Sequence, residues 1–161
     1  MKSILLTISA VLLLKAGIAH ADAFDDAIAA NKRGDYFTSF PLFEKLASQG
    51  DAAAQTSLGL MLEKGQGVPR SPTEAVQWYR QAAEQGYATA QVNLGLMYGK
   101  GLGVVQDEMR AYMWFMLAAG SGEANAIRNR NIAAQRLTPQ QITKALQMAR
   151  DCLQREFKSC E

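Results

Sequence analysis

The sequence has very few residues suited to nucleophilic or metal chemistry. Its single histidine, His20, lies near the start of the chain, and its two cysteines, Cys152 and Cys160, lie within the last ten residues. The rest of the chain therefore cannot form a Ser-His-Asp or Cys-His catalytic site or a histidine metal site. No serine is followed three residues later by lysine, so the acylating motif of serine β-lactamases is also absent. We expect no catalytic residue, no metal and no cofactor.

A hydrophobic run long enough to span a membrane is also lacking. Residues 4–14 are apolar except for Thr7 and Ser9, which gives 11 residues where a transmembrane helix needs about 20. Lys2 precedes this run and Ala19-His20-Ala21 follows it, a pattern typical of a secretory signal peptide and its cleavage site. We therefore predict a signal peptide at residues 1–21 and a single domain at 22–161. The predicted product is periplasmic or secreted, monomeric and without a membrane span.

An excess of either charge is missing from the predicted mature chain. Removal of Lys2 and Lys15 reduces 17 basic residues to 15, which equals the 15 acidic ones. A net charge of zero argues against nucleic acid as a partner. The charges are unevenly placed, since residues 22–63 hold seven acidic and three basic side chains and residues 124–161 hold three acidic and seven basic. We interpret this gradient as variation of solvent-exposed faces rather than as electrostatic steering.

The even number of cysteines predicts a disulfide in an exported protein. On an unbroken helix, Cys152 and Cys160 would lie about 12 Å apart. Disulfide geometry allows no more than about 7 Å between the two Cα atoms. If the two cysteines are bonded, the last helix must end near Glu156 and the tail must fold back over it.

What the sequence does contain is an internal repeat of 36 residues. Residues 51–86 and 87–122 are identical at 16 of 36 positions, most of them apolar residues or glycine. A repeat of this length, with apolar residues at helical spacing and a Gly-x-Gly loop in each unit, indicates a solenoid of helix pairs. Capping boxes are predicted at Ser71 to Glu74 and at Thr138 to Gln141, and a weaker cap is predicted at Asp107.

We therefore predict an all-α fold, an α-solenoid of stacked antiparallel helix pairs with a C-terminal capping helix. Residues 22–50 form a degenerate N-terminal helix pair, with helices expected at 24–32 and 35–49. Repeat 1 covers 51–86 and repeat 2 covers 87–122. Residues 123–161 supply a third first-helix, the capping helix from Pro139 and the tail. Terminal units of this kind close the open ends of a repeat stack.

Residues 51–122 resemble a known repeat family. Each unit reads A-x-A-Q-x-x-L-G-x-M-x-x-x-G-x-G-V and then A-x-x-W-x-x-x-A-A-x-x-G, with mild departures. This pattern resembles the Sel-one-like repeat, a relative of the tetratricopeptide repeat with a longer loop between its helices. The resemblance implies an α-solenoid that acts as a protein–protein scaffold, in bacteria often secreted and connected with envelope maintenance, cell-wall enzymes or host interaction. It implies no particular partner.

The function predicted from the sequence is a non-enzymatic scaffold or adaptor in the bacterial envelope that binds a protein partner on its concave face. In tetratricopeptide-like stacking, the first helix of each pair lines that face. The predicted partner-binding residues on these helices are Thr56, Leu60, Glu63, Thr89, Val92, Leu96, Arg128 and Ile132. The alternative for the apolar members is partial burial by neighbouring helices. Two other functions stay open: an inhibitor or immunity-type protein that blocks an envelope enzyme, and a cell-wall or β-lactam hydrolase.

Overall fold

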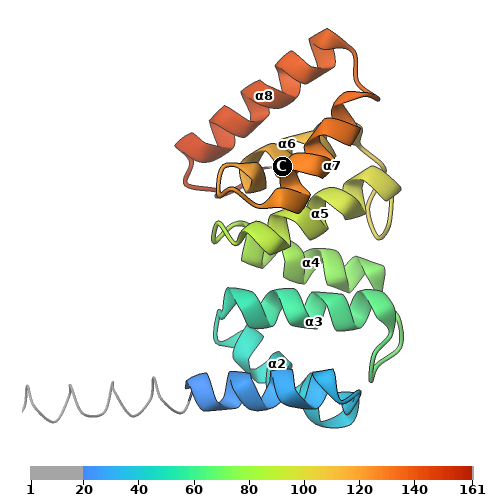
Figure 1. The fold of residues 1–161 in the computed structure, drawn as a ribbon, viewed down its shortest axis with the longest axis vertical. Helices are drawn as coiled ribbons and strands as arrows, with labels where there is room; N and C mark the ends of the chain where they lie inside the picture. Colours follow the sequence, from blue (N-terminus) through green and yellow to red (C-terminus); the bar gives the residue numbers. More distant parts are fainter. Residues whose placement is uncertain (1–19, 161) are drawn as a thin grey trace, which may run out of the picture.

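The computed structural model describes residues 20–160, which form helices and connecting loops without a strand. Residues 20–32 are helical. The helices that follow are α2 (Tyr36–Ser48), α3 (Ala52–Lys64), α4 (Pro72–Ala83), α5 (Ala88–Lys100), α6 (Glu108–Ala119), α7 (Ala124–Ala134) and α8 (Pro139–Gln154). They stack one above another along the long axis of the molecule (Figure 1). The predicted fold class, an α-solenoid, is confirmed.

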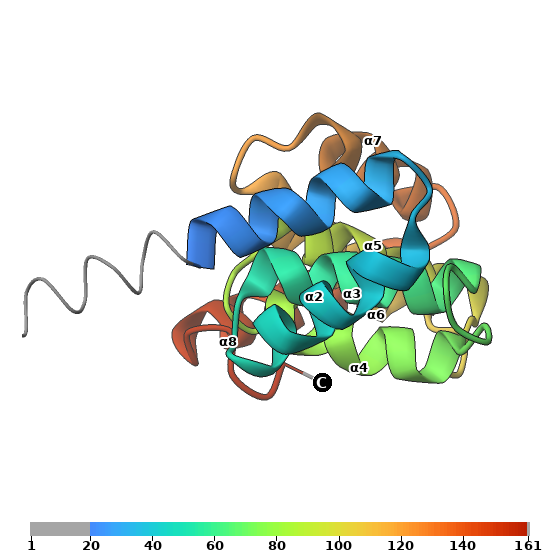
Figure 2. The ribbon, with the colours of Figure 1, turned by 90° about the horizontal axis from the view of Figure 1, so that it is seen from below.

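Successive helices pack against each other in chain order, except at the C-terminal end. There α7 and α8 both pack on α6. Figure 2 shows the helix of residues 20–32 and α7 on one side of the stack and α4 and α8 on the other. Helix α5 touches both α3 and α7, so the first helices of successive pairs are neighbours. We call the side formed by residues 20–32, α3, α5 and α7 the first-helix face.

Two glycines inside helices allow the two helices of each repeat to pack closely. A Cβ atom at Gly59 would lie 2.7 Å from Cε1 of Tyr79, and one at Gly95 would lie 2.6 Å from Cε1 of Phe115. Both rings are buried in the core, so they have little freedom to move away. The repeated glycine is therefore a packing requirement, which explains why both repeats keep it.

The Gly-x-Gly loop of each helix pair packs closely against the helix pair before it. Gly101 ends α5 with a φ of 65°, a left-handed conformation that glycine adopts without steric cost. A Cβ atom at Gly103 would lie 2.4 Å from the carbonyl oxygen of Pro72, so this loop lies directly on the start of α4. Gly67 has the same relation to Tyr36 at the start of α2, at 2.9 Å. The second glycine of each loop is thus needed for close approach of two backbone segments.

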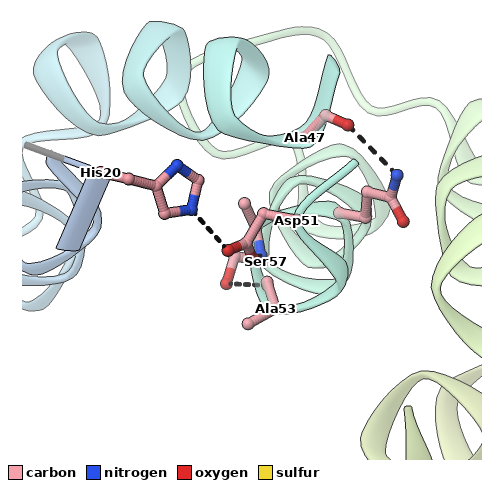
Figure 3. A network of polar contacts seen from close by, with 7 residues as sticks. His20, Ala47, Asp51, Ala53 and Ser57 are labelled. Carbon is pink, nitrogen blue, oxygen red and sulfur yellow. Dashed lines mark hydrogen bonds and ion pairs between the residues drawn. The ribbon is translucent and has the colours of Figure 1, made fainter. Parts of the chain in front are cut away.

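A buried glutamine links each repeat to the end of the preceding helix. The Gln55 side chain donates to the carbonyl oxygen of Ala47 at 3.1 Å, and Gln91 donates to that of Ala83 at 3.2 Å. The carbonyl of Ala47 and this bond are drawn in Figure 3. The same position in the third unit holds Ile127, whose side chain has no donor. The polar link is therefore made at two junctions and is absent at the third.

The helix caps differ from expectation at one site. The Thr138 capping box is present, and Asp107 accepts a hydrogen bond from the Arg110 backbone N–H at 2.9 Å. The predicted cap at Ser71 is wrong, because its hydroxyl donates to the Glu74 carboxylate at 2.7 Å instead of capping the backbone. Asp107 is the better cap because it accepts from the Arg110 backbone and also forms an ion pair with the guanidinium of the same residue.

The predicted signal peptide, residues 1–21, lies outside the described residues except for its last two. His20 begins the described part of the first helix, and its Nε2 lies 2.8 Å from the Asp51 carboxylate at the start of α3 (Figure 3). Partial burial opposes ionisation of Asp51, but hydrogen bonds from His20 and from the Ala54 backbone N–H outweigh it and hold its pKa below the usual range. Within residues 20–160, no helix is long and apolar enough to cross a membrane.

The C-terminal tail folds back as the cysteine spacing required. Helix α8 ends at Gln154, and a disulfide joins Cys152 to Cys160 with 4.8 Å between their Cα atoms. Three residues of the tail that are not glycine have positive φ values: Glu156, Phe157 and Ser159. The Phe157 ring lies against Gly86, in the turn between α4 and α5, because a Cβ atom there would be 3.3 Å from Cε2 of that ring. The tail therefore reaches back to the junction of the two repeats.

Candidate functional site

The predicted partner-binding residues lie on the first helices but do not all face solvent. Leu60, Thr89, Arg128 and Ile132 are exposed, and Glu63 and Leu96 are half-buried. Contrary to the expectation of an exposed stripe, Thr56 and Val92 are both buried, each with 7% of its surface exposed. Helix α5 contacts both α3 and α7, so part of each first helix is covered by its neighbours. The accessible stripe is therefore narrower than the sequence pattern indicated.

Glu63 is bound within its own repeat. Its Oε2 accepts a hydrogen bond of 2.8 Å from the hydroxyl of Tyr79, which is buried in the core. Burial, together with the nearby Glu63 carboxylate, raises the pKa of Tyr79 well above its usual value. This carboxylate therefore holds α3 against α4 and is only partly available to a partner.

A pocket lies where the first-helix face meets the start and middle of α6. It has a volume of about 150 Å³ and is lined by residues of α5, α6 and α7 together with Arg136, which follows α7. Two of the predicted residues, Leu96 and Ile132, line it together, whereas Leu60, Thr89 and Arg128 do not. The remaining lining residues are Gly99, Lys100, Glu108, Phe115, Asn129, Ala133 and Arg136.

The pocket combines apolar walls with a charged rim. Leu96, Phe115 and Ile132 supply the largest apolar surfaces. Arg136 forms an ion pair of 3.0 Å with Glu108, so one cation and one anion of the rim already compensate each other. Lys100 is exposed and forms no ion pair with any residue of the described range. The rim therefore carries one positive charge without a partner.

Sequence reasoning missed most of this pocket, although a signal for it exists. In the aligned repeats, Gly99 takes the place of Glu63 and Phe115 takes the place of Tyr79. Both halves of the Glu63–Tyr79 hydrogen bond are thus absent from the second repeat. The loss of both hydrogen-bonding residues in the same repeat marks the site. A change at only one of the two positions would look like ordinary variation between repeats.

Two further observations concern chemistry. In residues 20–160 there is no group of three or more histidine, cysteine or acidic side chains placed to hold a metal ion. A second cavity, of about 180 Å³, lies beside the disulfide and is lined by Met148, Asp151, Cys152, Arg155, Ser159 and Cys160.

The geometry of the first pocket, between α5, α6 and α7, suits recognition of an amphipathic group, because a few polar side chains surround an apolar interior.

Comparison with known repeats and proteins gives matches to one repeat family and to short parts of curated proteins. The family model of the Sel1 repeat matches residues 52–87 and 88–123, one residue later than the expected repeat boundaries. Among curated proteins, DAP3-binding cell death enhancer 1 of Rattus norvegicus is 47% identical over 45 residues, and that of Mus musculus is 44% identical over 45 residues. These matches cover 28% of this chain and 9% of those proteins.

Solved structures share the fold over a longer range. The crystal structure of c5321, a protective antigen present in uropathogenic Escherichia coli strains and displaying an SLR fold, matches 84% of this chain with a TM-score of 0.73 and 34% identity. A Sel1 repeat protein from Oxalobacter formigenes matches 65% of the chain with a TM-score of 0.62 and 37% identity. The matches cover 31% and 42% of those two chains. This chain thus spans less than half the length of each relative.

Proposed function

Because the chain is a Sel1-like repeat protein, a class that generally mediates protein–protein interaction, we propose that it is a non-enzymatic scaffold or adaptor that binds a protein partner on the first-helix face. The observation that supports this most directly is the pocket between α5, α6 and α7. It brings Leu96 and Ile132 together on a face where Leu60 is also exposed. Apolar side chains left open beside a charged rim are typical of an interaction site.

The bacterial envelope is the proposed location, in the periplasm or outside the cell. Three observations support it: the signal-peptide pattern of residues 1–21, the disulfide between Cys152 and Cys160, and the likeness to an antigen of uropathogenic Escherichia coli. Disulfides persist in oxidising compartments, which include the periplasm and the cell exterior.

Site-specific photo-crosslinking tests the proposed face. A photoreactive phenylalanine analogue is placed at Leu60 or Ile132 on the first-helix face, and at Gln77 or Gln147, exposed positions on α4 and α8. Each variant is expressed in a bacterium that makes the protein, and crosslinked products are identified by mass spectrometry. We expect one protein partner to be captured from the first two positions and not from the last two.

The pattern over the four positions decides the outcome. Capture of the same partner from Gln77 and Gln147 alone contradicts the proposed face. Capture of nothing from any position, in cells where the protein accumulates in folded form, contradicts the scaffold function itself.

A further inference from the structure

The pocket between α5, α6 and α7 occupies a place that the first repeat fills with its own side chains. In repeat 1, Glu63 and Tyr79 meet there through a hydrogen bond of 2.8 Å. In repeat 2 the same two positions hold Gly99 and Phe115, and both line the pocket. The space therefore corresponds to a carboxylate side chain that the second repeat does not supply.

The backbone around this space is held in the same way in both repeats. The Arg70 side chain donates to the carbonyl oxygen of Glu63 at 2.8 Å, and the Gln106 side chain donates to that of Gly99 at 2.9 Å. Arg70 and Gln106 are equivalent residues of the two loops, 36 positions apart. Since the loop and the helix end are tied together alike, the pocket results from missing side chains and not from a displaced backbone.

The walls of the pocket favour an apolar occupant. Leu96 from α5, Phe115 from α6 and Ile132 from α7 face the same space. Ile132 keeps 43% of its surface exposed, and its first-repeat equivalent, Leu60, keeps 37%. An apolar side chain that entered here would remove part of this surface from water, which is favourable in proportion to the area covered.

The rim favours a negative charge beside that apolar group. Lys100 and Arg136 are cations and Glu108 is the single anion that lines the pocket. Arg136 already compensates Glu108 through their 3.0 Å ion pair, which leaves Lys100 as the charge without a partner. A carboxylate next to the apolar side chain would lie within reach of Lys100 and would not have to displace an existing ion pair.

We propose that this pocket receives an apolar side chain of a partner polypeptide and that the residue beside it in the partner is acidic. The proposal rests on the proposed function, because it names the chemistry of the segment that the first-helix face binds. The Gly99 pocket, as we call the cavity lined by Leu96, Gly99, Lys100, Phe115 and Ile132, is then the specificity-determining part of that face.

Three short synthetic peptides serve as probes in nuclear magnetic resonance titrations of the isotope-labelled protein. Each has a glycine and serine background and carries leucine between two glutamates, leucine between two lysines, or serine between two glutamates. We expect the first peptide to bind about tenfold more tightly than either of the others. Its signal changes should centre on residues 96–100 and 129–136.

Gly99→Glu closes the pocket with the residue that repeat 1 uses. Gly99 has space for a side chain, since the only atoms within 4 Å of a Cβ there are the Cβ of Ala111 at 3.6 Å and Oε2 of Glu108 at 3.9 Å, and the new carboxylate can extend into the pocket away from Glu108. The variant should therefore fold with an unchanged circular dichroism spectrum and bind the glutamate–leucine peptide about tenfold more weakly. Thr89→Glu is the matched control, because it adds the same charge on the same helix without lining the pocket. It should leave binding unchanged.

Lys100→Gln tests the charge separately. It should remove most of the preference for the glutamate–leucine peptide over the lysine–leucine peptide, while the signal changes stay at the same residues. Equal binding of the three peptides, signal changes elsewhere, or no binding at millimolar concentration would overturn the proposal. So would unchanged binding by folded Gly99→Glu.

The results that contradict the pocket proposal differ from those that contradict the proposed scaffold function. If crosslinks from Leu60 and Ile132 to a partner persist in the Gly99→Glu background at wild-type yield, the first-helix face binds the partner without the Gly99 pocket. The scaffold function then stands and the specificity proposal is wrong. If crosslinks come only from Gln77 and Gln147, the proposed function itself is contradicted.

Discussion

At the scale of single residues, the repeated glutamine shows how a polar side chain becomes part of the repeat. Gln91 is buried, with 2% of its surface exposed, and it donates to the Ala83 carbonyl at the end of α4. The last carbonyls of a helix have no partner within the helix, and that of Ala83 is satisfied twice, by the Gly86 backbone N–H at 2.9 Å and by Gln91 of the next repeat. The sequence shows that the residue repeats, but only the packing of α4 against α5 shows what it bonds.

Gln91→Leu should destabilise the protein. The substitution keeps approximately the size of the side chain but removes one of the two hydrogen bonds that the Ala83 carbonyl accepts, since the 2.9 Å bond from the Gly86 backbone N–H remains; the loss costs about 0.5–1.5 kcal/mol. Urea denaturation followed by circular dichroism measures the change in free energy of unfolding. Gln140→Leu, at an exposed position at the start of α8, is the control and should change it by no more than about 0.5 kcal/mol. Equal effects of the two substitutions would show that the Gln91 bond contributes nothing.

Tyr79 gives the protein a sensitivity to alkaline pH. Its pKa is raised in the folded state, because burial and the Glu63 carboxylate disfavour the phenolate. The unfolded chain ionises this group near pH 10, so its contribution to stability is fully present below about pH 10 and is lost as the pH rises through the folded-state pKa. We expect Tyr79→Phe to be less stable than wild type at pH 7 and to lose less stability between pH 7 and pH 11.

Urea denaturation of the two proteins at both pH values checks this expectation. The difference at pH 7 should be about 0.5–3 kcal/mol, the range for a hydrogen bond between a neutral donor and a charged, partly exposed acceptor. A Tyr79→Phe variant that loses stability with pH as steeply as wild type would show that Tyr79 is not the responsible group.

At the scale of elements, the loops between helices contribute more to tertiary packing than their sequence indicates. The Gly-x-Gly pattern predicted a turn, and the first glycine of each loop fulfils that role. The second glycine contacts the start of a helix about thirty residues earlier, which is a tertiary relation that local pattern analysis does not contain. The cap at Ser71 was predicted wrongly for a local reason, since its hydroxyl donates to the Glu74 carboxylate three residues later and makes no hydrogen bond to the backbone of the first turn.

Gly103→Ala should be more damaging than Gly122→Ala. Both glycines have positive φ values, 72° and 82°, so each substitution bears the cost of a left-handed conformation, roughly 1–2 kcal/mol. A Cβ at Gly103 would also meet the Pro72 carbonyl at 2.4 Å, whereas nothing lies within 4 Å of one at Gly122. Close contact of this kind adds about 1–3 kcal/mol. Thermal unfolding of the two variants measures the difference, and equal midpoints would show that the loop does not press on α4.

At the scale of the whole molecule, the sequence predicted the architecture better than it predicted the site. A 36-residue repeat with helical spacing is sufficient to indicate a stack of helix pairs, because each unit must bury its apolar side against the next. Which flank of each first helix stays open depends on how the helices cross, and this was not readable for Thr56 and Val92, which are buried. The pocket exists because repeat 2 lacks two hydrogen-bonding side chains that repeat 1 has. A comparison of the positions that the two repeats share therefore does not reveal it.

The disulfide closes the C-terminal tail, whose Phe157 ring contacts the turn between α4 and α5, so loss of the disulfide should affect both places. Closing a loop of about nine residues contributes about 2.5 kcal/mol in the chain-entropy model. It also holds three residues at positive φ and keeps the Phe157 ring against Gly86, between α4 and α5. A variant with both Cys152→Ala and Cys160→Ala should therefore unfold at lower urea concentration and expose both the tail and that turn.

Hydrogen exchange of the double variant locates the effect. Because neighbouring units of a repeat stack stabilise one another locally, faster exchange is expected in residues 155–160 and 84–87, with little change in α2 and α3. Phe157→Ala, with the disulfide intact, is the matched control and should speed exchange at residues 84–87 while the loop closed by the disulfide stays protected. Uniformly faster exchange along the whole chain would contradict local coupling, and would indicate that the solenoid unfolds as one cooperative unit.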